Sequence, residues 1–163
     1  MKNPTLPVKT RILFVITLLF AAMASVQIVH AATITVTSTA DSGAGTLREA
    51  LASASDGDTI DFSVSGTITL TSVQLVVNNS LTIPGPGAAN LAVNGNAASR
   101  IFYISSGKTV TISGLTITNG RKSGIGIESQ GAGILNDHAT LTVSNCTISG
   151  NSAAGNGGGI YNT

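Results

Sequence analysis

The chain has 163 residues, of which only 9% are charged. Three of its eight basic residues and none of its seven acidic residues lie in the first 31 positions, so five basic residues against seven acidic ones leave the rest of the chain with a net charge of −2. This balance excludes the basic surface that a nucleic acid partner requires. The single cysteine, Cys146, excludes an intrachain disulfide, and no spaced set of Cys and His predicts a metal site.

Residues 1–31 have the pattern of a secretory signal peptide. Lys2, Lys9 and Arg11 precede an apolar run, and the small-residue site Val-His-Ala at 29–31 follows it. We expect cleavage after Ala31, a secreted or cell-surface location, and no membrane span in the mature chain. An uncleaved membrane anchor is the alternative, because the run is near the lower limit for spanning, about 17 residues, although it contains polar side chains.

Residues 32–58 read as an N-terminal cap. Residues 33–37 alternate as a strand, and residues 40–45 form a flexible turn. Thr46 followed by Glu49 is a capping box, and apolar residues at helical spacing run from there to Asp-Gly at 56–57. A short amphipathic helix at this place would cover the open end of a stack of strands.

Residues 59–163 read as coils made of short strands. Strands are expected at 59–62, 67–70, 74–77 and 80–83, followed by a wide Pro-Gly corner at 84–87. Residues 109–120, TVTISGLTITNG, return 31 positions later as TLTVSNCTISGN. Four apolar positions recur in register: Val110, Ile112, Leu115 and Ile117 fall on Leu141, Val143, Cys146 and Ile148.

Each of these repeats ends in a third strand, at 133–136 and 159–162. A unit of three short strands cannot bury its own apolar face, so it must stack on a copy of itself, which favours a parallel β-helix. Leucine-rich repeats and propeller blades share the periodicity, but they require a helix per unit or four strands per unit, and neither is visible. About three coils plus the cap are expected.

The register makes further predictions. Ile104 should pair with Leu135, also 31 positions apart, which places Tyr103 on Ile134 and predicts that Tyr103 packs in the protein. Asn136 and Asn162 should stack as a hydrogen-bonded ladder. Cys146 should be a buried structural thiol.

Two features concern the surface and the end of the chain. Residues 121–130 lengthen one corner by five positions, which suggests a binding loop or a tolerated surface insertion. The last coil stops at Thr163 without a closing helix, so we expect the chain to be the N-terminal part of a longer protein, truncated at its C-terminus.

Several segments resemble a known group of proteins. Residues 46–51, TLREAL, followed by DGDTI at 56–60, resemble the LREA-type N-terminal segment of secreted bacterial right-handed β-helix proteins. The segments ISGN at 148–151 and GGGI at 157–160 are similar to the GGAI and FxxN repeats of polymorphic outer-membrane proteins and related adhesins. The resemblance implies an all-β, right-handed parallel β-helix of the pectin-lyase-like superfamily with a short N-terminal capping helix.

We expect no catalytic, cofactor-binding or metal-binding residues in this sequence. Asp56, Asp58 and Asp61 are close enough in sequence to suggest calcium, but Asp-Gly-Asp at a corner is typical of turns, and alternation puts Asp61 on the opposite face. Asp137-His138 reads as a solvated corner, because adjacent residues cannot easily orient one another as in a triad. The basic residues that a lyase would need are Arg100 and Lys108, and neither is placed near an acidic pair.

We therefore expect a non-catalytic, secreted or cell-surface β-helix repeat protein that serves as a structural stalk or an adhesin-like surface. Its expected partners are extracellular glycans or host cell surfaces, and no cofactor is expected. The alternative is a polysaccharide lyase or glycoside hydrolase of the pectin-lyase-like fold, which the resemblance permits because a fold does not determine an activity.

Overall fold

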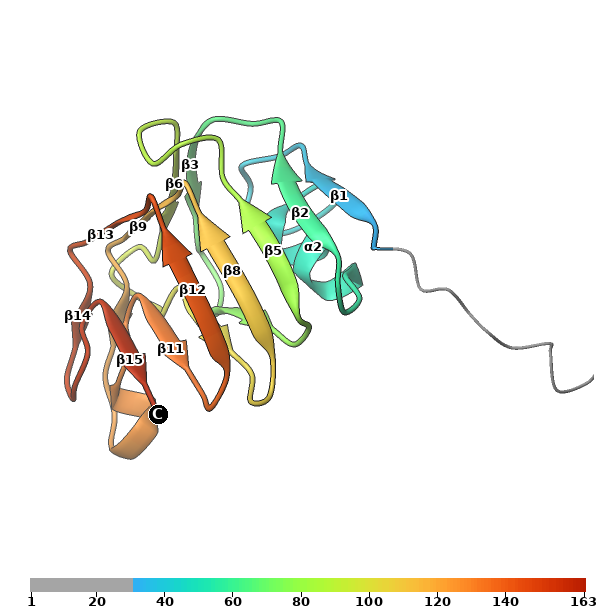
Figure 1. Cartoon of the computed structure of the whole chain (residues 1–163). Coiled ribbons are helices and arrows are strands. Elements are labelled where there is room, and N and C mark those ends of the chain that lie inside the picture. The colour runs from blue at the N-terminus through green and yellow to red at the C-terminus, as the bar shows by residue number, and fades with distance from the viewer. Residues whose placement is uncertain (1–30) are drawn as a thin grey trace, which may run out of the picture. The chain divides into compact units, whose positions relative to one another are not determined.

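The computed structural model describes residues 31–163, so the expected signal peptide lies outside the described residues apart from Ala31. The described chain is a parallel β-solenoid of about five turns with one short α-helix, which confirms the predicted fold class (Figure 1). Every strand pairing in it is parallel. Within residues 31–163, no helix is long and apolar enough to cross a membrane.

Three stacked sheets form the walls of the solenoid. Sheet 1 consists of β1 (Thr33–Val36), β2 (Thr59–Phe62), β5 (Leu81–Pro84), β8 (Thr109–Ser113) and β12 (Thr140–Ser144). Sheet 2 consists of β3 (Gly66–Thr69), β6 (Leu91–Asn94), β9 (Thr116–Thr118) and β13 (Thr147–Ser149). Sheet 3 consists of β4 (Leu75–Val77), β7 (Phe102–Ile104), β11 (Ile134–Asn136) and β15 (Ile160–Asn162). A short pair, β10 (Arg121–Lys122) with β14 (Ser152–Ala153), lies at one corner.

The number of coils is larger than expected. The strands from residue 59 to residue 77 form a complete coil of their own, and β1 joins sheet 1 as its first strand. The structure therefore has four three-stranded coils stacked on a first turn that contains β1 and the helix.

The 31-residue register is confirmed for the first two strands of the repeat. Val110 pairs with Leu141 and Ile117 with Ile148. The predicted register of the third strand is wrong by one residue, because Ile104 pairs with Asn136 and Tyr103 pairs with Leu135. Tyr103 therefore points outward, and the polar Asn136 takes a core position.

The core is the row of side chains that point into the solenoid from each strand. Ile60, Ile83 and Ile112 are completely buried in sheet 1, and Leu115 is completely buried at the corner that follows β8. Burial of one such side chain stabilises the fold by about 1.5–3 kcal/mol. Cys146 packs against this core but is only half-buried, because it belongs to the last coil, so the expected buried thiol is partly accessible.

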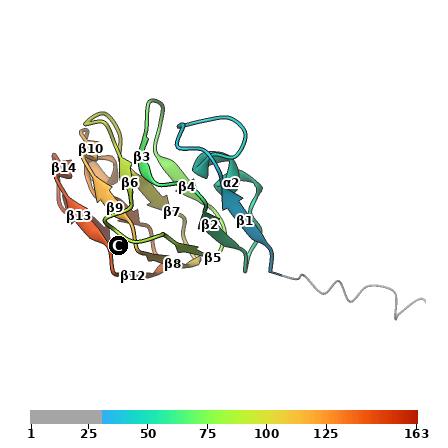
Figure 2. The ribbon, with the colours of Figure 1, turned by 90° about the horizontal axis from the view of Figure 1, so that it is seen from above.

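The helix α2 (Leu47–Ser53) closes the first turn, where sheet 3 has no strand (Figure 2). Leu47, Ala50 and Leu51 are buried on its inner face. The hydroxyl of Thr46 accepts from the amide of Glu49, as the capping box predicts, but the Glu49 carboxylate accepts from Gly45 at 2.6 Å rather than from Thr46. The helix ends at Ser53, before the expected Asp-Gly.

One corner requires glycine because the backbones of successive coils touch there. A Cβ atom on Gly95 would lie 2.7 Å from the Cα atom of Gly120, and a Cβ atom on Gly120 would lie 2.8 Å from the side-chain oxygen of Asn151 in the next coil. These distances are shorter than any van der Waals contact, so only glycine allows the coils to stack at the strand spacing.

Candidate functional site

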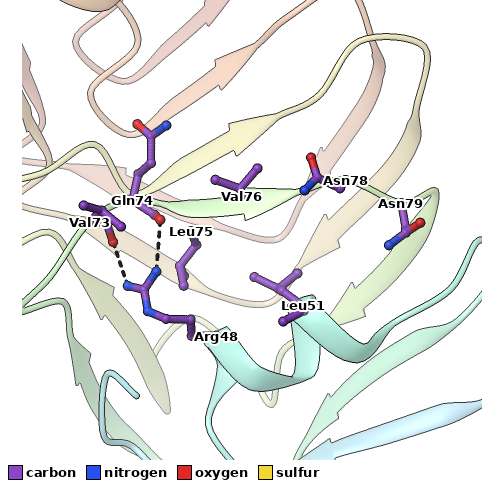
Figure 3. Close-up of a pocket in the computed structure, with 9 residues that line it drawn as sticks. Arg48, Leu51, Val73, Gln74, Leu75, Val76, Asn78 and Asn79 are labelled. Carbon is purple, nitrogen blue, oxygen red and sulfur yellow. Dashed lines mark hydrogen bonds between the residues drawn. The ribbon is translucent and has the colours of Figure 1, made fainter. Parts of the chain in front are cut away.

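A pocket of about 410 Å³ lies between α2 and the first strand of sheet 3, as Figure 3 shows. Because β4 is the end strand of its sheet, backbone groups on its free edge face this pocket. Val73 and Val76 are the exposed apolar residues of its lining, with 67% and 37% of their surface accessible. The other lining residues are Arg48, Leu51, Ala52, Gln74, Leu75, Asn78 and Asn79.

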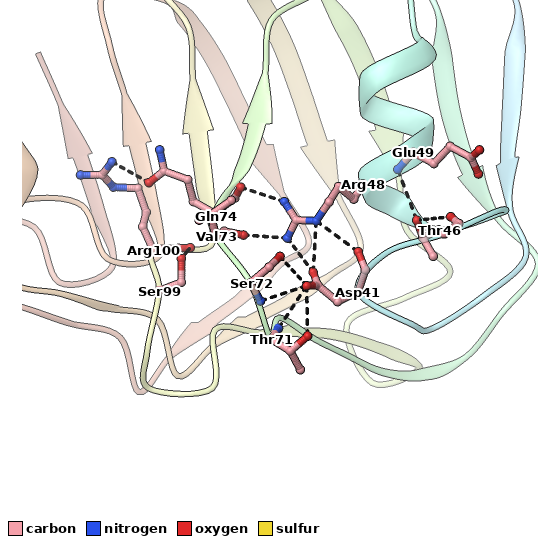
Figure 4. Close-up of polar contacts among 11 residues, drawn as sticks. Asp41, Thr46, Arg48, Glu49, Thr71, Ser72, Val73, Gln74, Ser99 and Arg100 are labelled. Atoms are coloured by element: carbon pink, nitrogen blue, oxygen red, sulfur yellow. Dashed lines mark hydrogen bonds and ion pairs between the residues drawn. The ribbon is translucent and has the colours of Figure 1, made fainter.

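Arg48 forms one wall of the pocket and binds the two residues that precede β4. Its Nη1 and Nη2 atoms donate to the carbonyl oxygens of Gln74 and Val73 at 3.0 and 2.6 Å. The helix presents Arg48 toward β4, and its guanidinium also pairs with the Asp41 carboxylate at 2.6 Å (Figure 4). With these partners, Arg48 fixes the helix to the edge of the sheet.

Asp41 is the acceptor at the centre of this network. Its Oδ2 atom accepts from the amide and hydroxyl of Ser72, at 3.0 and 2.6 Å, and from the amide of Thr71 at 3.2 Å. Burial opposes ionisation of this carboxyl, but the hydrogen bonds from Ser72 and Arg48 outweigh burial and lower the pKa of Asp41. The segment expected to be a flexible turn thus contains an ordered, charged anchor.

Arg100 is completely buried and lies at the same end of β4 as Arg48, because both bind Gln74. Its guanidinium donates to the side chain of Gln74 at 2.9 Å and to the carbonyl oxygens of Ile127, Gln130 and Gly131 at 2.9–3.3 Å. Burial lowers the pKa of Arg100, and the charge of Glu128 opposes this effect. All of these donors bind protein groups, so Arg100 is a structural cation and does not face a substrate as a lyase base would.

The loop that Arg100 holds is the one that the sequence marks as an insertion. It contains a short 3₁₀ segment, η1 (Gly126–Ser129), and an ion pair between Lys122 and Glu128 at 3.1 Å. Ile125 at its tip is 94% exposed. An ordered loop with an exposed apolar tip is compatible with a contact surface.

The outer side of sheet 3 carries Val76, Tyr103, Leu135 and Tyr161 in one column across the four strands; we call it the tyrosine face. Both tyrosines are half-buried, while Leu135 between them is covered. The guanidinium of Arg100 lies 5.9 Å from the centroid of the Tyr103 ring, within the range of a cation–π contact.

A polar cluster borders the tyrosine face where β11 ends. The Tyr103 hydroxyl donates to Asp137 at 2.6 Å, which raises the pKa of Tyr103 and lowers the pKa of Asp137. The other carboxylate oxygen of Asp137 lies 2.7 Å from the Nδ1 atom of His138, so these two adjacent side chains contact one another at an exposed corner. Thr163 contacts the same Nδ1 atom at 3.1 Å, and 69% of the His138 side chain is exposed.

Asp58 and Asp56, two of the three aspartates considered for calcium, serve the fold. Asp58 accepts from the amides of Ala32 and Ser55, both at 2.8 Å, and the hydrogen bond from Ser55 is the main cause of its lowered pKa. Asp56 accepts from the amide of Ser80 and pairs with Lys108 at 3.4 Å, so the second candidate base of a lyase has a carboxylate partner. Among residues 31–163, no three His, Cys, Asp or Glu side chains converge as a metal site would require.

The expected asparagine ladder is present on the inner side of sheet 3. The Nδ2 atom of Asn136 donates to the side-chain oxygen of Asn162, one coil further along, and to the carbonyl oxygen of Ala139 at 2.8 Å. The Asn136 side chain is only 2% exposed, and these bonds give its amide nitrogen the partners that a buried polar group needs. They confirm a structural role for Asn136.

The fold and these surfaces define the class of the protein as a parallel β-solenoid whose first turn is closed by a helix. No family model matches the chain, and no curated protein matches it.

Proposed function

We propose that this solenoid is a non-catalytic, secreted or cell-surface protein of the pectin-lyase-like type, and that it acts as an adhesin-like surface or stalk. In this proposal, the tyrosine face and the adjoining pocket contact extracellular glycans. The observation that carries the proposal is the arrangement of Tyr103 and Tyr161 in one column on a rigid sheet, next to a pocket with exposed apolar and amide side chains.

The chemistry of this surface suits a sugar chain. The rings of Tyr103 and Tyr161 lie two strands apart, which corresponds to about 10 Å. Aromatic rings at such a spacing can contact alternate pyranose rings of an extended glycan, whose faces carry C–H groups. Amide and carboxylate groups at the border, those of Asn78 and Asp137, can bind sugar hydroxyls.

The bonding of the basic residues supports a binding role over catalysis. A lyase needs a base close to the sugar and free of other partners, whereas Arg48 and Arg100 are hydrogen-bonded to the protein and Lys108 is paired. None of these three residues is therefore free to act as the base of a polysaccharide lyase or hydrolase.

The proposal predicts glycan binding that depends on the tyrosine face. The purified chain should be retained by extracellular polysaccharides in affinity electrophoresis, and Tyr161→Ala should lose most of this retention because the accessible part of an aromatic ring is removed. Thr67→Ala on sheet 2 is the matched control, since it shortens an exposed strand residue on another wall and should retain binding.

Two results would contradict the proposal. Retention unchanged by Tyr161→Ala would show that the tyrosine face is not the binding surface. Release of unsaturated sugars from pectin or alginate, measured by their absorbance, would show that the protein is a lyase and not only a binding surface.

A further inference from the structure

The outer side of sheet 1 is an almost uniform array of hydroxyl side chains, which we call the threonine face. Ten of its twelve outward positions are Thr or Ser, and eight are Thr. The central column is unbroken across all five strands, with each residue paired in register to the next. It consists of Thr33, Thr59, Thr82, Thr111 and Thr142.

Side columns extend the array on both edges of the central one. Thr109 pairs with Thr140 on one side, and Ser113 pairs with Ser144 on the other. The two outward positions without a hydroxyl are Asp61 and Pro84. Strands β5, β8 and β12 therefore present the most regular part of the face, and Figure 1 shows them side by side and leaning in the same direction.

The described part of the chain makes no hydrogen bond with the hydroxyls of the central column. Within residues 31–163, none of these five threonine side chains makes a hydrogen bond, whereas Thr116 on sheet 2 donates to the carbonyl oxygen of Ala88 at 2.7 Å. A β-branched side chain on a strand has a restricted χ1 angle, so each threonine holds its methyl and hydroxyl groups in a defined direction. The face is thus a preordered lattice of donors, acceptors and methyl groups.

The dimensions of this lattice point to a crystalline partner. Neighbouring strands lie about 4.8 Å apart, and alternate residues of one strand lie about 6.6 Å apart. The first of these repeats is close to the shortest repeat of water oxygens in hexagonal ice, and the second is somewhat shorter than the repeat along its six-fold axis. Ordered water held between the methyl groups and bonded to the hydroxyls could therefore continue into an ice surface without large displacement.

We propose that the threonine face binds ice. An ice surface is uncharged, and Asp61 is the one charged residue among the twelve outward positions. A crystalline polysaccharide, which is also flat and periodic, would be recognised through aromatic side chains, and the threonine face has none. This inference is independent of the glycan proposal, because sheets 1 and 3 are different walls of the solenoid.

The test is partition of the purified chain into slowly growing ice, together with inhibition of ice recrystallisation. The unaltered chain should be enriched in the ice fraction relative to a non-binding protein of similar size. Thr82→Tyr should lose this enrichment, because a ring at the centre of the face keeps the other threonines away from the crystal. Thr111→Tyr, on the next strand, should have the same effect.

Thr67→Tyr is the matched control, because Thr67, like Thr82, is an exposed strand threonine, and it lies on sheet 2 without a side-chain hydrogen bond in the described chain. It should keep the enrichment, and thermal melts should show that all three variants fold. Exclusion of the unaltered chain from ice, or equal enrichment of Thr82→Tyr and Thr67→Tyr, would overturn the proposal. Binding to microcrystalline cellulose that Thr82→Tyr abolishes, without enrichment in ice, would assign the face to a polysaccharide and would also overturn it.

Discussion

Leu115→Asp is expected to abolish folding. Leu115 is completely buried at the corner between β8 and β9, where its side chain packs against the backbone of Gly85 from the preceding coil. An aspartate there would leave a carboxylate in an apolar stack without a partner. We expect a cost on the order of 5 kcal/mol or more, which equals the whole stability of a marginal domain. Circular dichroism should show loss of the β-type spectrum and of the cooperative melt.

Thr147→Asp is the control for this substitution. Thr147 lies on β13, points outward and is exposed, so the same charge should remain solvated and change the stability little. A normal spectrum and melt for Leu115→Asp would contradict the assignment of Leu115 to the inner stack.

Arg100→Met is expected to produce the second largest effect. Methionine keeps the apolar stem but removes every donor, so four acceptors on Gln74, Ile127, Gln130 and Gly131 lose this partner. Unsatisfied buried groups cost about 1–3 kcal/mol each, and partial exposure of the loop to water reduces the total to about 3 kcal/mol. The melting temperature should fall, and trypsin should cleave faster after Arg121 and Lys122, because their loop is released.

Lys108→Met provides the comparison, because Lys108 forms a surface ion pair with Asp56 and such pairs contribute about 0–1 kcal/mol. Suppose that Arg100→Met had the same melting temperature and the same rate of trypsin cleavage as Lys108→Met. The loop would then be ordered by something other than the Arg100 guanidinium.

The sequence predicted the stacking of coils because apolar residues repeat in the core. Aligning apolar residues with apolar residues predicted two observed pairs, Val110 with Leu141 and Ile117 with Ile148. The same rule failed for the third strand, since the core position paired with Ile104 is held by Asn136. A buried asparagine is polar, so an alignment of apolar residues cannot identify it as a core residue. The predicted register of the third strand was therefore shifted by one residue.

Other features depend on contacts between residues that are distant in sequence. The capping box of α2 is local and was predictable, but the Asp41 network joins it to Ser72, 31 residues away. Arg48 is bound to the edge of β4 for the same reason, and no pattern in its own segment indicates that partner. The threonine column, in contrast, follows from the alternation of each strand once the register between strands is known.

The central claim is that successive coils stack in register, with the first two strands of the last two coils 31 residues apart, and disulfide cross-linking tests it most directly. On a Cys146→Ser background, Thr111→Cys with Thr142→Cys places two thiols on paired residues of β8 and β12. Adjacent strands hold such Cα atoms about 4.8 Å apart, within the range that a disulfide spans. Mild oxidation should form this disulfide rapidly within one chain. The control is Thr111→Cys with Ser149→Cys, which combines a sheet 1 position with a sheet 2 position and should form a disulfide much more slowly. Equal rates for the two pairs, or no intrachain bond for the first, would contradict the solenoid register.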